Sequence, residues 1–201
     1  MAITADQVNQ LRGKTAAGFM QCKKALEESN GDIDKAVELL RKMGAAAAEK
    51  KVGRTAGEGM VYSYIHPGSR VGVLLEVNCE TDFVARNDDF KQLCHDLALH
   101  VAAAVPIAVR REEVDPNLVQ KERTIYLAQA AESGKPEAVQ QKMVEGRVEK
   151  FFGEFVLLEQ PFIKDPDKKV QDLVTAAIAK LGENIVVRRF TRYQIGSYPE
   201  A

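Results

Sequence analysis

The tripeptide GKT at residues 13–15 comes nearest to nucleotide chemistry, because it matches the last three residues of a phosphate-binding P-loop. The complete motif needs a glycine five positions before this tripeptide begins, and the chain has Val8 there. A P-loop also follows a strand, whereas residues 4–7 read TADQ, a capping box that predicts the start of a helix. The sequence therefore does not predict a phosphate-binding loop.

The histidines do not form a catalytic or metal-binding pattern. His95 and His100 are five residues apart on a stretch with helical periodicity, which puts them on different faces and excludes a paired metal site. We expect both at the surface. His66 lies in the predicted turn IHPGS, where no serine or cysteine nucleophile with a supporting acid can be assigned to it. We interpret His66 as a contact residue rather than a base.

The three cysteines, Cys22, Cys79 and Cys94, are odd in number, widely spaced and without a C-x-x-C motif. This pattern argues against a disulfide framework and against a zinc site. We expect reduced thiols in the core or at the surface. The carboxylates are spread along charged helix faces, so we expect no catalytic constellation, no metal site and no cofactor, and we do not predict an enzyme.

The composition predicts a folded globular protein, with 45% hydrophobic and 28% charged residues. The net charge of −1 gives no overall attraction to nucleic acid, although residues 1–54 contain 10 Lys and Arg against 7 Asp and Glu. No apolar run approaches the roughly 18 residues of a membrane span, and the N-terminus lacks a signal peptide pattern. We therefore expect a cytoplasmic protein that does not enter a membrane.

The N-terminal part predicts three short helices. The capping box starts the first, which we expect to end at Gly13, and the second spans about residues 17–28. Asp32 caps the third, whose apolar residues follow helical spacing until Gly44. These helices would form a compact bundle, and the glycine-rich residues 45–59 would form a partly helical linker.

The rest of the chain predicts an α+β core. Strands at residues 60–66 and 70–78 form a hairpin, a helix covers 88–105, and another covers 169–181. A last strand covers 185–195 and alternates apolar and polar residues from Val187 onwards. Prolines at 116 and 136 start two helices of a protruding helical hairpin at about residues 112–155. Its expected inner stripe consists of Val119, Tyr126, Ala130, Val139, Met143 and Phe151. We divide the chain into domains 1–54 and 55–201.

This arrangement gives a small antiparallel sheet of about three strands with helices on one side. Such a sheet leaves edges or a face to be covered, which favours a second subunit or another partner.

Two stretches resemble the signature segments of the bacterial elongation factor Ts family: LRGKTAAGFMQCKKAL at residues 11–26 and EVNCETDFVAR at residues 76–86. The resemblance continues in family order through most of the chain, including QPFIKDP at 160–166 and GENIVVRRF at 182–190. It implies a ubiquitin-associated-like three-helix domain, an α+β core and a helical hairpin. It also implies a guanine nucleotide exchange factor that binds elongation factor Tu with GDP and promotes exchange for GTP.

The resemblance gives roles to Thr81, Asp82, Phe83 and Val84, which match the family segment that inserts near the Mg²⁺ site of the GTPase. By this resemblance Phe83 is a wedge and Asp82 a polar anchor. The residues alone allow another interpretation, in which Thr81 only caps a short helix and Phe83 turns inward onto the core.

Further candidates for partner binding are Phe19, Met20 and Lys23 in the first signature, and His66 at the tip of the hairpin. Phe19 and Met20 could instead belong to the core of the bundle, and Lys23 could be a solvated surface charge.

The chain resembles a short form of the family. Residues 62–84 combine features that long members distribute over two core halves, so a homodimer would supply the second half. The chain stops at GSYPEA, so contacts made by the C-terminal extension of long members are not carried over. We expect no direct nucleic-acid contact. The alternative function is a ubiquitin-associated-like adaptor or an RNA-binding module on the basic N-terminal part.

Overall fold

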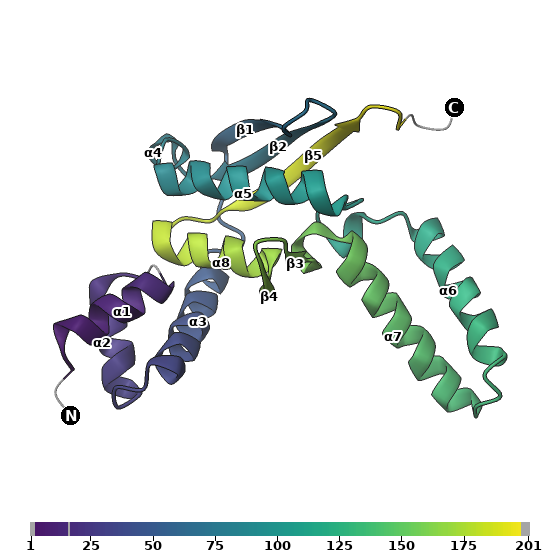
Figure 1. The fold of residues 1–201 in the computed structure, drawn as a ribbon, viewed down its shortest axis with the longest axis horizontal. Coiled ribbons are helices and arrows are strands. Elements are labelled where there is room, and N and C mark those ends of the chain that lie inside the picture. Colours follow the sequence, from purple (N-terminus) through teal and green to yellow (C-terminus); the bar gives the residue numbers. More distant parts are fainter. Residues whose placement is uncertain (1–2, 16, 198–201) are drawn as a thin grey trace. The chain divides into compact units, whose positions relative to one another are not determined.

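A computed structural model describes residues 3–15 and 17–197, and most of the terminal GSYPEA lies outside them. The fold is α+β (Figure 1). The chain divides into two compact units. The first comprises the chain up to Met60, Asn78–Leu93 and Asp172–Val186, and the second comprises Val61–Val77, Cys94–Gln171 and the chain from Val187 onwards. The domain division at residue 54, made from the sequence, stays a proposal.

The first unit begins with a three-helix bundle of α1 (Ala5–Thr15), α2 (Phe19–Glu28) and α3 (Ile33–Glu49). The predicted capping box is present: the Gln7 amide oxygen accepts the Thr4 N–H at 3.0 Å, and the Thr4 hydroxyl accepts the Gln7 N–H at 3.3 Å. The Asp32 carboxylate caps α3 as expected. The buried core of the bundle consists of Val8, Leu11, Cys22, Ala25, Leu26, Ala36 and Leu40.

Two helices of the bundle are longer than predicted. α1 continues past Gly13 to Thr15, and α3 continues past Gly44 to Glu49. Both glycines keep helical backbone geometry, because a glycine inside a helix costs only about 1 kcal/mol and does not by itself end it. The alanines that follow Gly44 are strong helix formers, so α3 takes up the first part of the predicted linker.

Helix α8 (Val170–Leu181) lies next to α3 within this unit. The Arg41 guanidinium pairs with the Asp172 carboxylate at 2.7 Å, and the Lys51 ammonium donates to the Gly182 carbonyl oxygen. These contacts tie the end of the bundle to α8 and to the turn that follows it.

The sheet has the strand order β1 (Glu58–Ile65), β2 (Val71–Cys79), β5 (Val186–Gln194), with antiparallel strands. The turn between β1 and β2 is closed by the His66 N–H, which donates to the Val71 carbonyl oxygen at 2.9 Å. Gly68 takes a φ of 90° in this turn, a backbone conformation that favours glycine. The hairpin predicted from the sequence is therefore confirmed.

Helix α5 (Asp88–Ala104) lies along the inner face of the sheet (Figure 1). The Tyr62 hydroxyl of β1 is 3.0 Å from Nδ1 of His95, and the Arg192 guanidinium of β5 donates to the Ala102 carbonyl oxygen at 3.1 Å. The buried side chains of this layer include Val73, Leu75 and Val77 of β2 and Cys94, Leu97, Ala98 and Val101 of α5.

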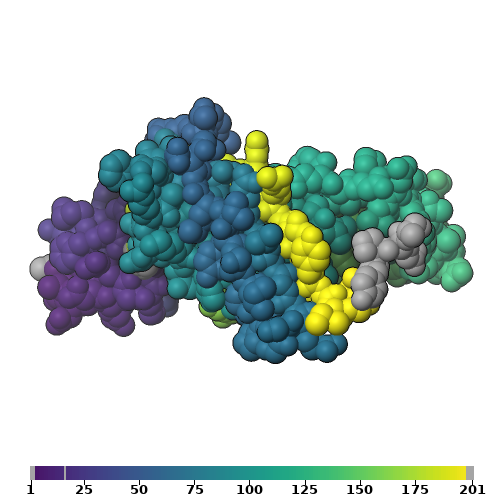
Figure 2. Space-filling model, turned by 90° about the horizontal axis from the view of Figure 1, so that it is seen from above, coloured from purple at the N-terminus to yellow at the C-terminus, as the bar shows by residue number. Residues whose placement is uncertain are grey.

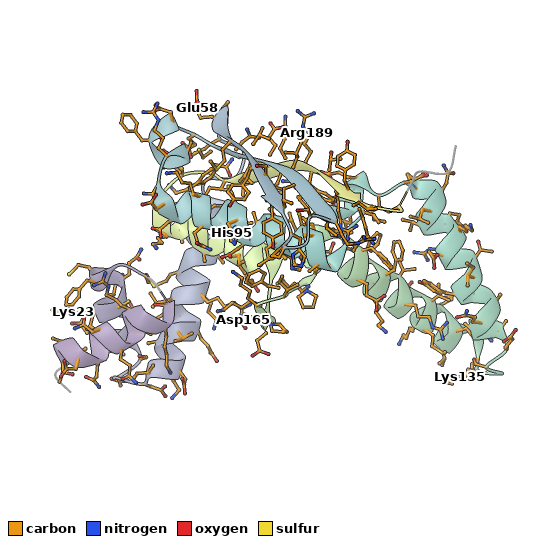
Figure 3. All side chains as sticks on the ribbon, turned by 45° about the horizontal axis from the view of Figure 1, so that its top comes forward. Lys23, Glu58, His95, Lys135, Asp165 and Arg189 are labelled. Carbon is orange, nitrogen blue, oxygen red and sulfur yellow. The ribbon has the colours of Figure 1, made fainter. Side chains whose placement is uncertain are left out.

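The outer face of the sheet, which we define by Val61, Ile65, Leu74, Tyr193 and Ile195, is exposed and apolar. The exposed fractions of these side chains run from 49% for Leu74 to 69% for Tyr193. A shallow groove of about 290 Å³ crosses this face from β1 to the end of β5. Figure 2 shows the blue strands β1 and β2 beside the yellow β5 at the surface, and Figure 3 shows Arg189 and His95 on opposite sides of the sheet.

The helical hairpin consists of α6 (Pro116–Ala131) and α7 (Glu137–Phe155), which run side by side (Figure 1). Asp115 caps α6 as its carboxylate accepts the Asn117 N–H at 2.9 Å. Val144 and Val148 are buried, whereas Val139 is 40% exposed. The predicted stripe was therefore wrong at Val139, whereas Phe151 is buried as predicted, and Val144 and Val148 supply the rest of the inner face of α7.

The base of the hairpin is fixed by Arg111, in a short 3₁₀ turn at Arg111–Glu113. Its guanidinium donates two hydrogen bonds to Glu159, both 2.7 Å, and two to Glu149, 3.1 and 3.0 Å, and lies 4.7 Å from the centre of the Phe152 ring. The hydrogen bonds to Glu159 and Glu149 raise the pKa of Arg111, and Arg111 lowers the pKa of Glu149.

A two-stranded sheet follows the 3₁₀ turn Leu157–Glu159 and was not predicted from the sequence. Its strands are β3 (Pro161–Phe162) and β4 (Asp165–Lys169), which pair in antiparallel fashion. Prolines at 161 and 166 hide the strand pattern, because a proline has no N–H for pairing.

The expectation for the two histidines of α5 was wrong for His100, which is 0% exposed, and His95 is half-buried. Burial lowers the pKa of His100, and its hydrogen bond to Gln160 opposes that shift only in part. The three cysteines are buried thiols and form no disulfide.

Candidate functional site

The most exposed large hydrophobic side chain among the described residues is Phe83, at 81%. It lies on the four-residue helix α4 (Asp82–Ala85), which begins three residues after β2. The Thr81 hydroxyl caps this helix by accepting the Val84 N–H at 3.4 Å. The capping part of the alternative interpretation is therefore correct, but the inward-turned Phe83 is not.

The phenyl ring of Phe83 contributes little to the stability of the free protein. Burying such a side chain stabilises a structure by about 1.5–3 kcal/mol, and this contribution is largely unused at an exposed position. Asp82 pairs with Arg86 on the same helix at 2.8 Å, with both side chains well exposed. The helix therefore presents an apolar ring next to a carboxylate that can exchange its partner.

Side chains from the turn after α8 hold the backbone in front of α4. One oxygen of the Glu183 carboxylate accepts the N–H groups of Glu80 at 3.1 Å and Thr81 at 3.0 Å. The other oxygen accepts the Thr81 hydroxyl at 2.6 Å. In return, the Glu80 carboxylate accepts the Asn184 N–H at 2.6 Å.

A further segment joins these contacts. The buried Asn184 side chain donates to the Arg54 carbonyl oxygen at 2.8 Å, and the Arg54 guanidinium lies 3.7 Å from the Glu80 carboxylate. Residues 182–184, GEN, lie within one stretch of the family resemblance, but the resemblance assigns Glu183 no role. A glutamate that acts on residues about 100 positions away leaves no local pattern, so only the tertiary structure identifies Glu183.

Cys79, at the end of β2, lies in the same neighbourhood. Its thiol donates to the Thr81 carbonyl oxygen at 3.1 Å. Burial, with the nearby Glu183 carboxylate, raises the pKa of Cys79 to about 11. The thiol therefore stays protonated at neutral pH, and its role here is to hold the Thr81 backbone rather than to act as a nucleophile.

The other predicted contact residues lie on two more elements. Phe19 is 43% and Met20 70% exposed, so their assignment to the core of the bundle is wrong. Lys23 on the same helix is exposed and pairs with Glu27 at 3.9 Å (Figure 3). His66 is exposed in the β1–β2 turn, with Nδ1 3.0 Å from the Tyr64 hydroxyl. The candidates thus come from α4, α2 and this turn.

The part of the chain that the structure describes contains no group of three or more side chains arranged to hold a metal ion. Within the same residues, no helix combines the length and the hydrophobicity that crossing a membrane requires.

Comparisons with known proteins extend over nearly the whole chain. The family model described as Elongation factor TS matches residues 4–197. Elongation factor Ts of Geotalea daltonii is 57% identical over 196 residues, which cover 98% of this chain and 91% of that protein. Elongation factor Ts of Alkaliphilus oremlandii is 60% identical over 196 residues, which cover 98% of this chain and 90% of that protein. Elongation factor Ts of Herpetosiphon aurantiacus is 57% identical over 197 residues, which cover 98% of this chain and 100% of that protein. The similarity thus includes both units.

Proposed function

The chain belongs to the elongation factor Ts family, and from this premise we propose that it is a guanine nucleotide exchange factor for elongation factor Tu. It binds the GTPase in its GDP-bound form and promotes release of GDP, so that GTP can replace it. The observation that carries the proposal is Phe83, a phenyl ring 81% exposed on a short helix whose backbone is fixed by Glu183.

Residues 81–84, which we name the exchange segment, act on the magnesium and phosphate site of the partner. A translational GTPase holds GDP through a phosphate cradle and a Mg²⁺ ion that neutralises phosphate charge. Displacing elements that support this ion weakens the nucleotide without touching its base. Phe83 is the wedge, Asp82 is the polar anchor, and Thr81 and Val84 form the helical turn that carries them.

Phe83 cannot supply the whole effect. An acceleration of about 10⁴-fold requires about 5.5 kcal/mol of barrier lowering, whereas burial of one phenylalanine contributes about 1.5–3 kcal/mol. Binding energy from a wider interface must therefore hold the GTPase in its distorted state. Phe19, Met20, Lys23 and His66 are the further contacts we assign, since all four are exposed in the free protein.

The exchange follows from binding alone, without a covalent step, a metal ion or a cofactor of this chain, so we do not propose an enzyme. If the protein weakens nucleotide binding, nucleotide must weaken binding of the protein by the same factor. The factor therefore accelerates exchange in both directions, and an excess of GTP over GDP gives the direction. This function places the protein in the cytoplasm, without direct contact to nucleic acid.

The functional form we propose is a homodimer. The outer face of the sheet is the surface that a second copy would cover, because its exposed apolar side chains lie on adjacent strands. Packing two such faces against each other gives the layered arrangement that a three-stranded sheet lacks alone.

The experiment that tests the proposal measures release of labelled GDP from elongation factor Tu with and without the wild-type protein. We expect faster release, and we expect excess GDP to compete with formation of the complex. RNA binding that persists without elongation factor Tu and falls steeply with salt, together with an unchanged release rate, would favour the RNA-binding alternative. An unchanged release rate without RNA binding would leave only the adaptor function.

A further inference from the structure

We propose that Glu183 is a positioning residue for the exchange segment: through its two carboxylate oxygens it fixes the direction in which Phe83 projects. The inference rests on the proposed function and extends it to Glu183, to which the resemblance assigned no role. Glu183 does not need to touch the partner for this role, because it acts through the backbone and hydroxyl of the exchange segment.

Hydrogen bonds at the start of α4 are the first observation that supports this role. The N–H groups that precede and begin a helix have no acceptor within it. Glu183 supplies one to Glu80 at 3.1 Å and to Thr81 at 3.0 Å. These charge-assisted hydrogen bonds are stronger than neutral ones and fix two successive peptide groups. Phe83 follows two residues later, so the path of the backbone into α4 is set by one carboxylate.

The Thr81 hydroxyl makes two contacts that extend this anchoring into α4. It donates its proton to Glu183 at 2.6 Å and accepts the Val84 N–H at 3.4 Å. Because the hydroxyl hydrogen of Thr81 points toward the Glu183 carboxylate, a lone pair of the Thr81 oxygen is left to face the Val84 amide. The contacts of Glu183 therefore reach the chain on both sides of Phe83.

The polar network matters because packing holds α4 only in part: Asp82, Val84 and Ala85 are half-buried and Phe83 is exposed. A helix of four residues is far too short to be stable by itself, and none of the four is buried. The turn that carries Glu183 is itself anchored, as Asn184 donates through its backbone to Glu80 and through its side chain to the Arg54 carbonyl oxygen. The segments that contain Arg54, Glu80 and Glu183 thus together fix the direction of the exposed Phe83 ring.

Loss of this anchoring reduces the fraction of molecules whose segment is ready to insert. Because the wider interface forms the complex in either case, the rate of GDP release within the complex falls in proportion to that fraction. Loss of one charge-assisted hydrogen bond is enough to change such a population about tenfold or more.

The first readout uses the free protein and does not depend on elongation factor Tu. In Glu183→Ala, we expect hydrogen-exchange protection of the amides of Glu80, Thr81 and Val84, measured by NMR, to fall about tenfold or more. Glu183→Gln keeps an acceptor of the same shape and should give an intermediate loss. Arg41→Ala is the matched control: it breaks the ion pair between Arg41 and Asp172 and removes no hydrogen bond to residues 80–84. Unchanged protection in Glu183→Ala overturns the inference.

The second readout is the maximal rate of GDP release from elongation factor Tu at saturating factor. We expect Glu183→Ala to lower this rate about tenfold and Arg41→Ala to leave it unchanged. If Glu183 acts through Phe83, the double variant Glu183→Ala/Phe83→Ala releases GDP no more slowly than Phe83→Ala alone. Additive losses would show that Glu183 acts elsewhere. A wild-type rate in Phe83→Ala would instead overturn the proposed role of the segment, while the amide protection would still decide whether Glu183 holds it.

Discussion

At the scale of single residues, His100 is a titratable group that the fold requires to be neutral. Its Nε2 contacts the Gln160 side-chain oxygen at 2.9 Å, and its Nδ1 contacts the Ile163 backbone N–H at 3.3 Å. Because the amide can only donate, Nδ1 must carry no proton, and Nε2–H donates to Gln160. A second proton would place two donors against each other in a site that is 0% exposed.

This arrangement predicts a loss of stability in mild acid. Burial lowers the pKa of His100 below its unfolded value of about 6.5, so below that pH the unfolded chain binds more protons than the native protein. The contribution of His100 to the free energy of unfolding is present above pH about 6.5 and decreases as pH falls through the lowered native pKa. Urea unfolding between pH 7 and 5 measures this decrease.

The control for this prediction is His100→Gln, which removes the titrating group. We expect a lower free energy of unfolding at pH 7, by about 1–3 kcal/mol, because one hydrogen-bond geometry is lost in a buried site. We also expect a weaker dependence on pH between 7 and 5 than in the wild type. The same slope in both proteins would contradict the assignment.

Residue-level function could be predicted only in part. The resemblance identified Phe83, but burial could not be read from the sequence, and the residues alone also allowed a ring turned inward two positions after Thr81. Glu183 was missed for a different reason. Its partners, Glu80 and Thr81, are about 100 residues away, and hydrogen bonds to backbone N–H groups place no demand on the residue types at those positions.

At the scale of elements, the end of α5 stores strain. Val105 follows the helix with a φ of 50°, a left-handed conformation that is costly for a β-branched residue. Its N–H still donates to the Val101 carbonyl oxygen at 3.3 Å, and Pro106 prevents the helix from continuing. Val105 is 47% exposed, so a replacement that relieves the strain removes little packing.

Val105→Asn is therefore expected to stabilise the protein by about 1 kcal/mol, since asparagine tolerates the left-handed conformation. For a chain of this size, this raises the midpoint of thermal unfolding by about 2–4 °C. Val105→Thr is the matched control, because threonine keeps the branched Cβ and should leave the midpoint near the wild-type value. A lower midpoint in Val105→Asn would contradict the strain argument.

The elements that the sequence predicted well are those with local causes. The capping box at residues 4–7 and the capping residue Asp32 start their helices where expected, and β-branched and aromatic residues on either side of a turn sequence gave β1 and β2. The ends of α1 and α3 could not be placed from Gly13 and Gly44, because nothing local decides whether a helix passes a glycine.

At the scale of the whole molecule, the outer face of the sheet is the surface whose exposure the single chain does not explain. Val61 and Ile65 on β1 are more than 60% exposed, as is Tyr193 on β5, and Leu74 lies between them on the central strand β2. An apolar face of this kind on adjacent strands favours association with a second sheet.

We predict that Leu74→Glu dissociates the proposed homodimer without unfolding the chain. A carboxylate at the centre of an apolar interface would be buried without a partner in the dimer, but it stays solvated in the monomer. Sedimentation at micromolar concentration should change from twice the chain mass of 22.2 kDa to that mass.

The matched control is Val52→Glu, a change at a side chain that is 73% exposed and lies outside the sheet. It should sediment as the wild type does. A wild-type protein that sediments as a monomer at this concentration would contradict the dimer.

The proposed function depends most on Phe83 acting on the nucleotide site of elongation factor Tu, and the maximal rate of labelled GDP release tests this directly. At saturating concentration, Phe83→Ala should lower the rate by about 10- to 150-fold, the equivalent of about 1.5–3 kcal/mol of lost burial. Thermal unfolding of the free variant should be unchanged, since Phe83 is 81% exposed. Phe83→Leu keeps an apolar side chain and should lose less. A Phe83→Ala variant that releases GDP as fast as the wild type would contradict the account.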